Sequence, residues 1–430
     1  MRASKLAILG GTKTVVSPPQ DLYAWPLIGE EDEAAVLDLL RKPNFIDSKA
    51  VEAIEEEFSE WLGSKYALAC SSGTSAIEAA LFACGVGPGS EVIAPSLTHW
   101  ASVFPAFRLG ATVVFADVLP STLNLDPVSV GRLVTSRTRI IVVVHQHGRP
   151  CDMDALKALA KSHSVALLED ASHALGSRYK GRKVGVLGDV GIFSLNGKSL
   201  AAGEGGMLVT NDRALFERAL AWGHDHRFTR VNVQDTHLQP FAGLPLGGTT
   251  SRMHNLTAAL ARVQLRHFQS RMEIVDAAMK LFWDRLKDVS GVVAHGPPAE
   301  EGSTMGCWYR PLGLYEAKDL GGLDLSVFAA AVSAEGVDCG LLSDFRQPLH
   351  VHARLRDGGD AGFAGAPQVR CRFDTNLRAT ENVSAFTVPR FSKLDPVAIE
   401  AHAEAFAKVV RHHKELLSAE ISEMSSKTQD

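Results

Sequence analysis

The feature that most constrains this chain is the alternation of short apolar runs with stretches of helical periodicity. Six runs carry apolar side chains on successive positions: SEVIAPS (90–96), ATVVFADV (111–118), RIIVVVHQHG (139–148), VALLEDAS (165–172), VGIFSLN (190–196) and GGMLVTND (205–212). A strand that is apolar on both faces must be covered on both faces, as in a parallel sheet between two layers of helices. With a further strand ending near Cys70, the sequence predicts an α/β fold on a mainly parallel, seven-stranded sheet.

Helical patterns and loop signals suggest how the chain is divided. The segments 48–63 and 72–85 both have apolar residues at helical spacing. Because 430 residues are many for one simple core, we expect two domains. The expected division is an extended N-terminal arm over 1–30, a large domain over 31–270, a smaller α+β domain over 271–418 and a flexible tail over 419–430.

Charge and cysteine content exclude several kinds of partner. The formal net charge is −5, and both signs are scattered along the chain, which offers no basic face for nucleic acid or an anionic membrane. No run approaches the roughly 20 apolar residues of a membrane span. The six cysteines lie far apart without a CxxC pair, so neither a disulfide framework nor a metal site is expected. We therefore expect a cytoplasmic protein that acts on small molecules.

Polar residues follow several of the expected strands, at the sheet edge where parallel α/β folds bind ligands. After the strand that ends near Cys70, Gly73, Thr74 and Ser75 open a helix. The unpaired backbone N–H groups and the dipole of a helix start attract phosphate. An ordinary N-cap explains the same residues, because Ser and Thr often satisfy the amides of a first helical turn.

Three further segments place chemically useful groups at the same edge. Asp170 ends the run 165–172 and precedes His173, so it can hold a protonated ring nitrogen or simply cap the next helix. Lys198 stands after Ser194 in a glycine-rich loop, as a nucleophile or as an exposed lysine. In PSLTHWASVFPA, His99 and Trp100 follow a strand; the ring of Trp100 can stack on a planar ligand or pack in the core.

The joint occurrence of these segments in one order favours a single interpretation. Together they supply a phosphate cradle, a flat ring, a carboxylate and an amine. Enzymes that use pyridoxal 5′-phosphate need a lysine that forms a Schiff base and an Asp partner for the ring nitrogen. The residues therefore predict a pyridoxal phosphate site with Lys198 as the nucleophile.

The chain also resembles a known family. SSGTSAIEAAL, GSEVIAPSLTHWAS, GATVVFADV, SRMHNLTAAL and the long block from Leu167 to Asp212 are similar to successive motifs of the DegT/DnrJ/EryC1/StrS aminotransferases, and the similarity runs from about residue 25 to about residue 415. The resemblance implies the fold of the fold-type-I pyridoxal phosphate enzymes. It also implies amino transfer to keto-sugars or cyclitols.

The resemblance further implies roles for individual residues. Lys198 would carry the cofactor as a Schiff base, Asp170 would hold the pyridine nitrogen, and His173 would lie near the ring hydroxyl. The positions that match phosphate-binding residues of the family are Gly73, Thr74, Ser75 and Ser194. His99 occupies the place of a stacking aromatic ring, so Trp100 is an alternative for that function.

The family's site is usually shared across a homodimer. An asparagine of the neighbouring subunit typically reaches the phosphate there, and this chain has Thr250 at that position, followed by Arg252. Arg227 lies in a loop rich in His and Arg that either recognises substrate or is simply solvated. In FRQPLHVHARLRDG, which matches a family segment that closes near the substrate, Arg346 and His350 are further candidates.

The expected reaction is transfer of an amino group from glutamate or glutamine to a keto-sugar or cyclitol ketone, in secondary-metabolite or aminosugar biosynthesis. An N-terminal LAILGG resembles the subgroup that makes aminocyclitols and aminohydroxybenzoate, which favours an acceptor without a nucleotide. Elimination or carbon–carbon bond formation on the same scaffold is the alternative, although related sugar dehydratases replace the lysine by histidine. A ligand-binding relative without activity is a third hypothesis, against which the intact Lys198 and Asp170 count.

Overall fold

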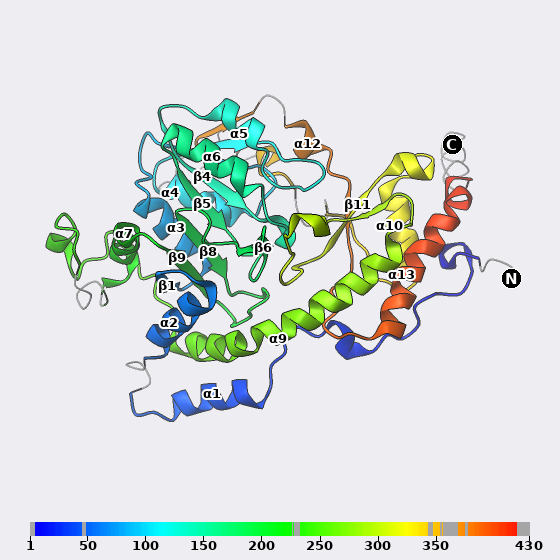
Figure 1. Cartoon of the computed structure of the whole chain (residues 1–430), viewed down its shortest axis with the longest axis horizontal. Helices are drawn as coiled ribbons and strands as arrows, with labels where there is room; N and C mark the ends of the chain where they lie inside the picture. Colours follow the sequence, from blue (N-terminus) through cyan, green and yellow to red (C-terminus); the bar gives the residue numbers. More distant parts are fainter. Residues whose placement is uncertain are drawn as a thin grey trace, which may run out of the picture.

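A computed structural model describes residues 5–44, 49–225, 227, 233–342, 347–352, 355, 369–374 and 377–418. The expected tail over 419–430 lies outside these residues. A large α/β body occupies one side of the molecule, and a smaller part that includes α10 and α13 occupies the other (Figure 1). Among the described residues, no helix combines the length and the apolar character that crossing a bilayer requires.

The large body is built on one eight-stranded sheet with the order β1-β9-β8-β5-β4-β2-β3-β12. In that order its strands are Tyr66–Cys70, Gly206–Thr210, Val190–Ser194, Ala166–Asp170, Thr138–Val144, Glu91–Pro95, Thr112–Ala116 and Cys371–Phe373. Only β9 runs antiparallel to its neighbours; the other paired strands are parallel. All six apolar runs and the strand ending at Cys70 are therefore strands of this sheet, as predicted.

The sheet has eight strands rather than the seven expected, because β12 comes from the later part of the chain. Its three residues pair in parallel with β3, and the ring of Phe373 stacks on that of Phe115 with 5.7 Å between centroids. Asp374 secures the strand by accepting hydrogen bonds from Ser129 Oγ at 2.5 Å and Arg132 Nη2 at 2.7 Å. So short a strand gives no periodic signal in the sequence, and these long-range contacts decide its place.

Both faces of the sheet are covered, as the continuous apolar runs require. In β4, Ile141 and Val143 belong to one core, whereas Ile140 and Val142 belong to another on the opposite face. The first core is shared with α2 (Ala50–Leu62), α5 (Pro127–Leu133), α6 (Met153–His163) and α9 (Asn255–Leu286). The second is shared with α3 (Gly73–Ala83), α4 (Phe104–Arg108) and α7 (Arg213–Gly223).

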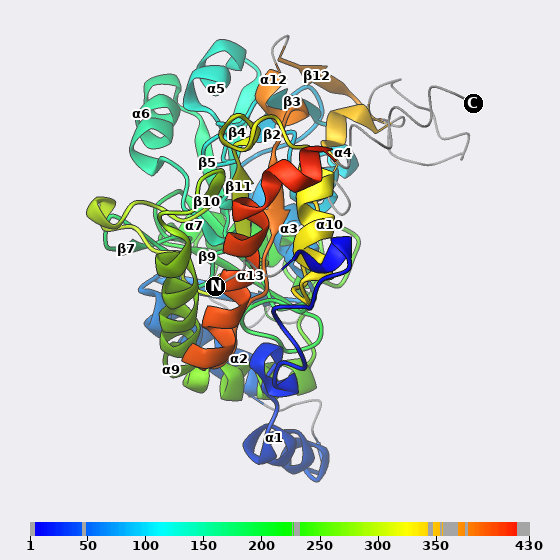
Figure 2. The same ribbon diagram turned by 90° about the vertical axis from the view of Figure 1, so that its right-hand side faces the viewer.

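The smaller part packs around the far end of α9. A three-stranded antiparallel sheet has the order β10-β11-β13, with strands Val292–Ala294, Leu312–Tyr315 and Ala385–Thr387. Helices α10 (Leu325–Ala334) and α13 (Pro396–Arg411) lie beside it, and α13 runs along α9 (Figure 2). The expected domain boundary at residue 270 falls inside α9, which continues unbroken through it; the division of the chain stays a prediction.

The remaining elements are short or peripheral. They are α1 (Glu30–Leu40), the hairpin of β6 (Arg178–Tyr179) and β7 (Arg182–Lys183), and α12 (Arg378–Glu381). In the N-terminal arm, the described residues 5–29 contain 3-10 turns and are packed rather than extended, because Leu6 and Leu22 are fully buried. Glu335 secures it by accepting hydrogen bonds from Ala7 N at 2.8 Å and Thr14 Oγ1 at 2.7 Å.

Candidate active site

A cavity of about 520 Å³ lies at the carboxyl ends of the parallel strands. Eight residues singled out from the sequence line it: Gly73, Thr74, His99, Trp100, Asp170, His173, Ser194 and Lys198. They come from four separate connections of the sheet, after β1, β2, β5 and β8. The fold thus brings together the segments that were expected to share one edge.

Asp170 is the last residue of β5 and holds a fixed orientation in the cavity wall. Ser102 Oγ donates a hydrogen bond to its Oδ2 at 2.7 Å, and the backbone N–H of Ser172 donates to Oδ1 at 3.1 Å. Ser102 is in turn 3.0 Å from Thr98 Oγ1. The carboxylate is only 5 % exposed, and both of its oxygens have partners, so its position is set before any ligand binds.

The neighbouring acid, Glu169, points the other way because successive strand residues face opposite sides of a sheet. It is fully buried and accepts hydrogen bonds from His145 Nε2 at 3.0 Å and from the backbone N–H groups of Gly185, Leu187 and Gly188. Burial by itself would raise the pKa of Glu169, but these donors hold it below its usual value. Glu169 therefore secures the 185–188 loop, while Asp170 serves the cavity.

Lys198 lies in the loop between β8 and β9, and its ε-amino group contacts Tyr309. Lys198 Nζ donates a hydrogen bond to the Tyr309 hydroxyl at 2.8 Å and lies 4.2 Å from the centroid of that ring. The backbone carbonyl of Lys198 accepts a hydrogen bond from Trp25 Nε1 at 2.8 Å. An aromatic side chain thus holds each end of the lysine.

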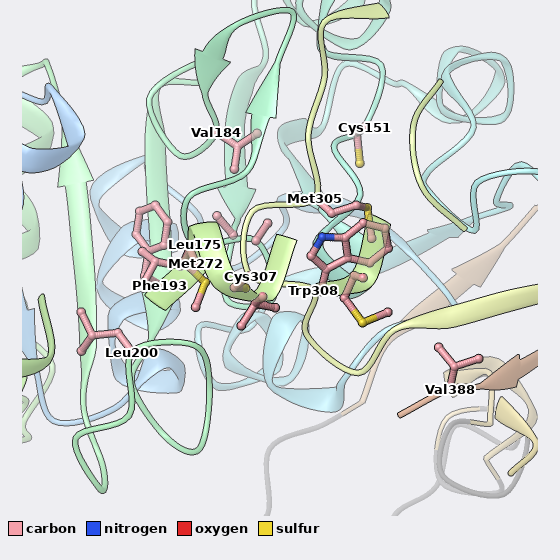
Figure 3. Packing of buried hydrophobic residues seen from close by; sticks show 14 of the residues in the cluster. Cys151, Leu175, Val184, Phe193, Leu200, Met272, Met305, Cys307, Trp308 and Val388 are labelled. Carbon is pink, nitrogen blue, oxygen red and sulfur yellow. The ribbon is translucent and has the colours of Figure 1, made fainter. Parts of the chain in front are cut away.

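Tyr309 is a site residue that sequence reasoning missed. Its ring stacks on that of His173, with 4.5 Å between centroids and 29° between planes. The preceding Cys307 and Trp308 are buried in the main core (Figure 3), and Trp308 Nε1 donates to Asp276 at 3.0 Å. Nothing in the local pattern of CWYRPLGLY indicates this contact, since its partner lies 111 residues earlier.

The turn before α3 fits both interpretations of its sequence. Ser72 and Ser75 form a reciprocal cap: Ser75 N donates to Ser72 Oγ at 3.1 Å, and Ser72 N donates to Ser75 Oγ at 2.9 Å. Ser75 is therefore occupied by capping and does not line the cavity, whereas Gly73 and Thr74 do. A Cβ on Gly73 would lie 3.0 Å from Ser194 Cβ, so glycine allows this close approach of α3 and β8.

The rings of His99 and Trp100 form one wall of the cavity. Their centroids are 5.1 Å apart, and His99 Nδ1 accepts a hydrogen bond from Ala101 N at 3.3 Å. Trp100 is 47 % exposed, which core packing would not produce. The wall therefore offers aromatic surface to a planar ligand.

The Thr250 segment lies beside the capped turn but outside the cavity of this subunit. Thr250 is exposed, and the next carbonyl, of Ser251, accepts a hydrogen bond from Ser71 N at 2.7 Å. Arg252 pairs with Cys70 as an isolated bridge, and its Nη1 lies 3.9 Å from Asp225. These contacts place the segment next to the first turn of α3 without bringing Thr250 or Arg252 into the cavity wall.

The other substrate candidates are held elsewhere. Arg227 forms an ion pair with Glu55; burial raises the pKa of Glu55 to about 7, although Arg227 opposes that shift. His350 Nδ1 lies 2.6 Å from Ser96 Oγ, and its Nε2 lies 3.2 Å from Glu381. Neither Arg227 nor His350 lines the cavity, and Arg346 lies outside the described residues. Their substrate roles stay predictions.

A family model for the DegT/DnrJ/EryC1/StrS aminotransferases matches residues 26–359 of this chain. The chain belongs to this family. The match covers every strand of the large sheet except β12, as well as the capped turn, Asp170, Lys198 and the Tyr309 segment.

Relatives and solved structures agree with this assignment. The chain is 44 % identical to the spore coat polysaccharide biosynthesis protein SpsC of Bacillus subtilis, over 63 % of the chain and 70 % of SpsC. It is 31 % identical to the L-glutamine:scyllo-inosose aminotransferase of Streptomyces griseus, over 96 % of the chain and 99 % of that protein. An aminotransferase structure from Psychrobacter cryohalolentis matches 91 % of the chain and 99 % of its own length, with a TM-score of 0.77 and 27 % identity.

The predicted family, fold class and enzyme class are thus confirmed. Pyridoxal 5′-phosphate is the cofactor of these aminotransferases, and the cavity has what that molecule needs: an oriented carboxylate, a lysine amine, aromatic walls and a helix start opened by Gly73. Among the described residues, no group of three or more His, Cys, Asp or Glu side chains is arranged to hold a metal ion.

Proposed function

We propose that this protein transfers an amino group from glutamate or glutamine to the ketone of a keto-sugar or cyclitol. The observation that carries the proposal is that Lys198 and Asp170, from separate connections of the sheet, line one cavity at its edge. The full-length similarity to an aminotransferase named for scyllo-inosose supports a cyclitol ketone as acceptor.

Asp170 and Lys198 have complementary tasks in this proposal. Bound pyridoxal phosphate supplies a carbonyl for the amine and a ring that accepts electrons. Asp170, kept in place by Ser102 and the Ser172 amide, holds a proton on the pyridine nitrogen. Lys198 moves a proton at its ε-amino nitrogen, for which it must be neutral part of the time.

The surrounding residues bind and orient the cofactor. Gly73, Thr74 and Ser194 lie where the α3 start can hold the phosphate, and the cap formed by Ser72 and Ser75 keeps that start rigid. His173 is stacked on Tyr309, which places it beside the Lys198 amine. A cavity of about 520 Å³ is within the usual range for a small-molecule site.

The proposal includes a homodimer with the site near the subunit boundary. Trp100 also lines a small apolar pocket of about 340 Å³, together with Phe104 and Phe107. A second copy of the chain on this face would cover the exposed indole and bring its own Thr250 to the phosphate. Size-exclusion chromatography with light scattering tests the dimer. The cytoplasm stays the predicted compartment.

The proposal is tested by a donor screen on the protein loaded with pyridoxal phosphate. Glutamate or glutamine should change its visible absorption spectrum and release one equivalent of the corresponding keto acid. Adding scyllo-inosose or a keto-sugar should then restore the starting spectrum. If the protein binds the cofactor but no amino acid releases a keto acid, elimination or carbon–carbon bond chemistry replaces amino transfer as the proposed function.

The attachment residue is tested separately. Borohydride reduction should fix the cofactor on the peptide that contains Lys198, as read by mass spectrometry. Lys198→Ala should lose this product and its turnover, whereas Lys180→Ala should keep both, because Lys180 is an exposed lysine paired with Asp154. Turnover retained by Lys198→Ala would remove the nucleophile from the proposal.

A further inference from the structure

A second cavity, of about 730 Å³, adjoins the active site. The two cavities share Gly197, Tyr309 and Arg310 in their walls. The rest of the second cavity comes from the N-terminal arm and from the smaller part of the chain, including Trp25 and Arg390. None of these last residues takes part in the chemistry proposed above.

Arg390 is a cation whose guanidinium is partly buried. Its Nε and Nη2 atoms are buried, and neither has a hydrogen-bond partner among the described residues. The guanidinium carbon lies 3.8 Å from the centroid of the Trp25 ring, which packs against one face of the cation but accepts nothing from its N–H groups. A buried donor without an acceptor is costly, so such a group in a cavity wall needs an explanation.

Among the residues that the structure describes, none forms an ion pair with Arg390. Burial lowers the pKa of Arg390 to about 10, a shift that Cys307 only partly opposes. Asp338 is the one acidic residue among the described residues that line this cavity; it is exposed and forms no ion pair with Arg390. Arg310 adds a second guanidinium to the same wall. The cavity is therefore suited to an anion.

The cavity is also linked to the catalytic loop. Trp25, on which Arg390 stacks, donates its indole N–H to the carbonyl oxygen of Lys198. Arg310 follows directly after Tyr309, the partner of the Lys198 amine. Through Trp25, an anion bound to Arg390 would thus be linked to the loop that carries the nucleophile.

We propose that Arg390 binds a carboxylate of the substrate in this second cavity, while the reacting carbon of the same molecule lies near Lys198. The planar fork of a guanidinium binds the two oxygens of a carboxylate with two parallel hydrogen bonds, and burial strengthens them. The inference rests on the proposed function, because it assigns this subsite to a molecule that reacts at Lys198. The carboxylate belongs either to the amino donor or to a carboxylated acceptor.

The test is calorimetric titration of the protein loaded with pyridoxal phosphate. Glutarate represents the carboxylates of the donor, and 3-hydroxybenzoate represents a carboxylate on an acceptor ring; glutaramide and 3-hydroxybenzamide are the neutral controls. At least one carboxylate should bind about tenfold or more tightly than its amide. The acid that shows this preference identifies the source of the carboxylate.

Variants locate the binding. Arg390→Gln should reduce the preferred carboxylate's affinity about tenfold or more, and Arg390→Lys should keep part of it, because the charge remains without the fork. Arg182→Gln, at an exposed arginine of the β6–β7 hairpin, should bind as the wild type does. Thermal melting checks the fold of each variant. If Arg390→Gln does not fold, Arg390→Lys decides the test: a weakened carboxylate preference supports the inference, and an intact preference contradicts it.

Two results would overturn the inference. One is equal binding of each acid and its amide by the wild-type protein; the other is a carboxylate preference that survives intact in both Arg390 variants. These results are distinct from failure of the proposed function, since the wild-type protein should bind pyridoxal phosphate on Lys198 and release keto acid from the donor whichever of them is found.

Discussion

The ε-amino nitrogen of Lys198 and the hydroxyl oxygen of Tyr309 are 2.8 Å apart, although 111 residues separate them in the chain. The hydrogen bond joins the catalytic loop to a segment anchored by buried Cys307 and Trp308. It gives the amine a defined position instead of leaving it to the flexibility of a four-carbon side chain. We therefore predict that Tyr309 positions Lys198, the proposed nucleophile.

Replacing Tyr309 should lower kcat and leave KM almost unchanged. In Tyr309→Phe the ring still stacks on His173, but the hydroxyl that orients the amine is gone. We expect kcat to fall about tenfold to a hundredfold, with little change in the KM of the donor, because misplacement of a reacting group slows chemistry more than binding. Steady-state kinetics measure both. Tyr179→Phe, whose hydroxyl contacts Asp152 away from the cavity, is the control, and an unchanged kcat in Tyr309→Phe would contradict the positioning role.

The hydrogen bond from Ser102 to Asp170 should tune the electrostatics of the site. Asp170→Asn removes the negative charge, so turnover should fall by at least about a hundredfold. Ser102→Ala removes one charge-assisted hydrogen bond, worth roughly 1.5–3 kcal/mol, and should lower turnover about tenfold or more. The visible spectrum of the loaded protein reports the state of the ring nitrogen in each variant. A Ser102→Ala enzyme with wild-type spectrum and rate would show that Asp170 needs no such support.

The close approach of α3 and β8 predicts that Gly73 controls cofactor affinity. In Gly73→Ala the new methyl group would lie 3.0 Å from Ser194 Cβ, so the turn must shift away from the strand that helps form the cradle. We expect the Kd for pyridoxal phosphate to rise about tenfold, measured by fluorescence titration of the cofactor-free protein. Gly87→Ala is a matched control, since no atom lies within 4 Å of its Cβ position. Equal affinities in the two variants would contradict this account of the cradle.

Glu169 should contribute stability that depends on pH. Because its folded-state pKa is lowered, its contribution is fully present above about 4.3, the usual value of an unfolded glutamate, and is lost as the pH falls through the folded pKa. Glu169→Gln places an NH₂ group among backbone donors and should cost about 3 kcal/mol at neutral pH. Denaturant unfolding of the cofactor-free protein across a pH series measures both effects.

The difference between wild type and variant isolates the contribution of this residue. The difference in free energy of unfolding between the wild type and Glu169→Gln should become smaller as the pH falls. Glu300→Gln, at an exposed glutamate, should show no gap at any pH. A gap for Glu169→Gln that stays constant down to low pH would mean that the side chain is not ionised in the folded protein.

Much of the active site was predictable because its segments have recognisable local sequence patterns. The β4 run is apolar on both faces and lies in a doubly covered sheet, and the Ser72–Ser75 cap begins α3. The polar residues that follow parallel strands met at one edge, because parallel strands all end on the same side. Asp170, Lys198 and their neighbours could therefore be predicted as site residues from the sequence.

Other residues could not be assigned from their surroundings in the chain. Asp170 and Glu169 are adjacent acids of one strand end, yet only Asp170 faces the cavity. Arg227 occurs in a loop with the composition of a substrate-binding segment, but its guanidinium is held by Glu55. The partner that decides the task of each side chain lies far away in the sequence, so composition alone leaves both possibilities open.

The sequence by itself determined seven strands of the large sheet, the sheet edge that carries the candidate site, and the lysine and aspartate at that edge. These features depend on periodicity, caps and strand direction, which are properties of short segments. Only the tertiary structure decided that Tyr309 contacts Lys198, that β12 completes the sheet, and that two buried nitrogens of Arg390, in the wall of a second cavity, have no hydrogen-bond partner among the described residues. Contacts of this kind form during folding between segments that are distant in the chain. No short stretch of the sequence therefore contains both partners.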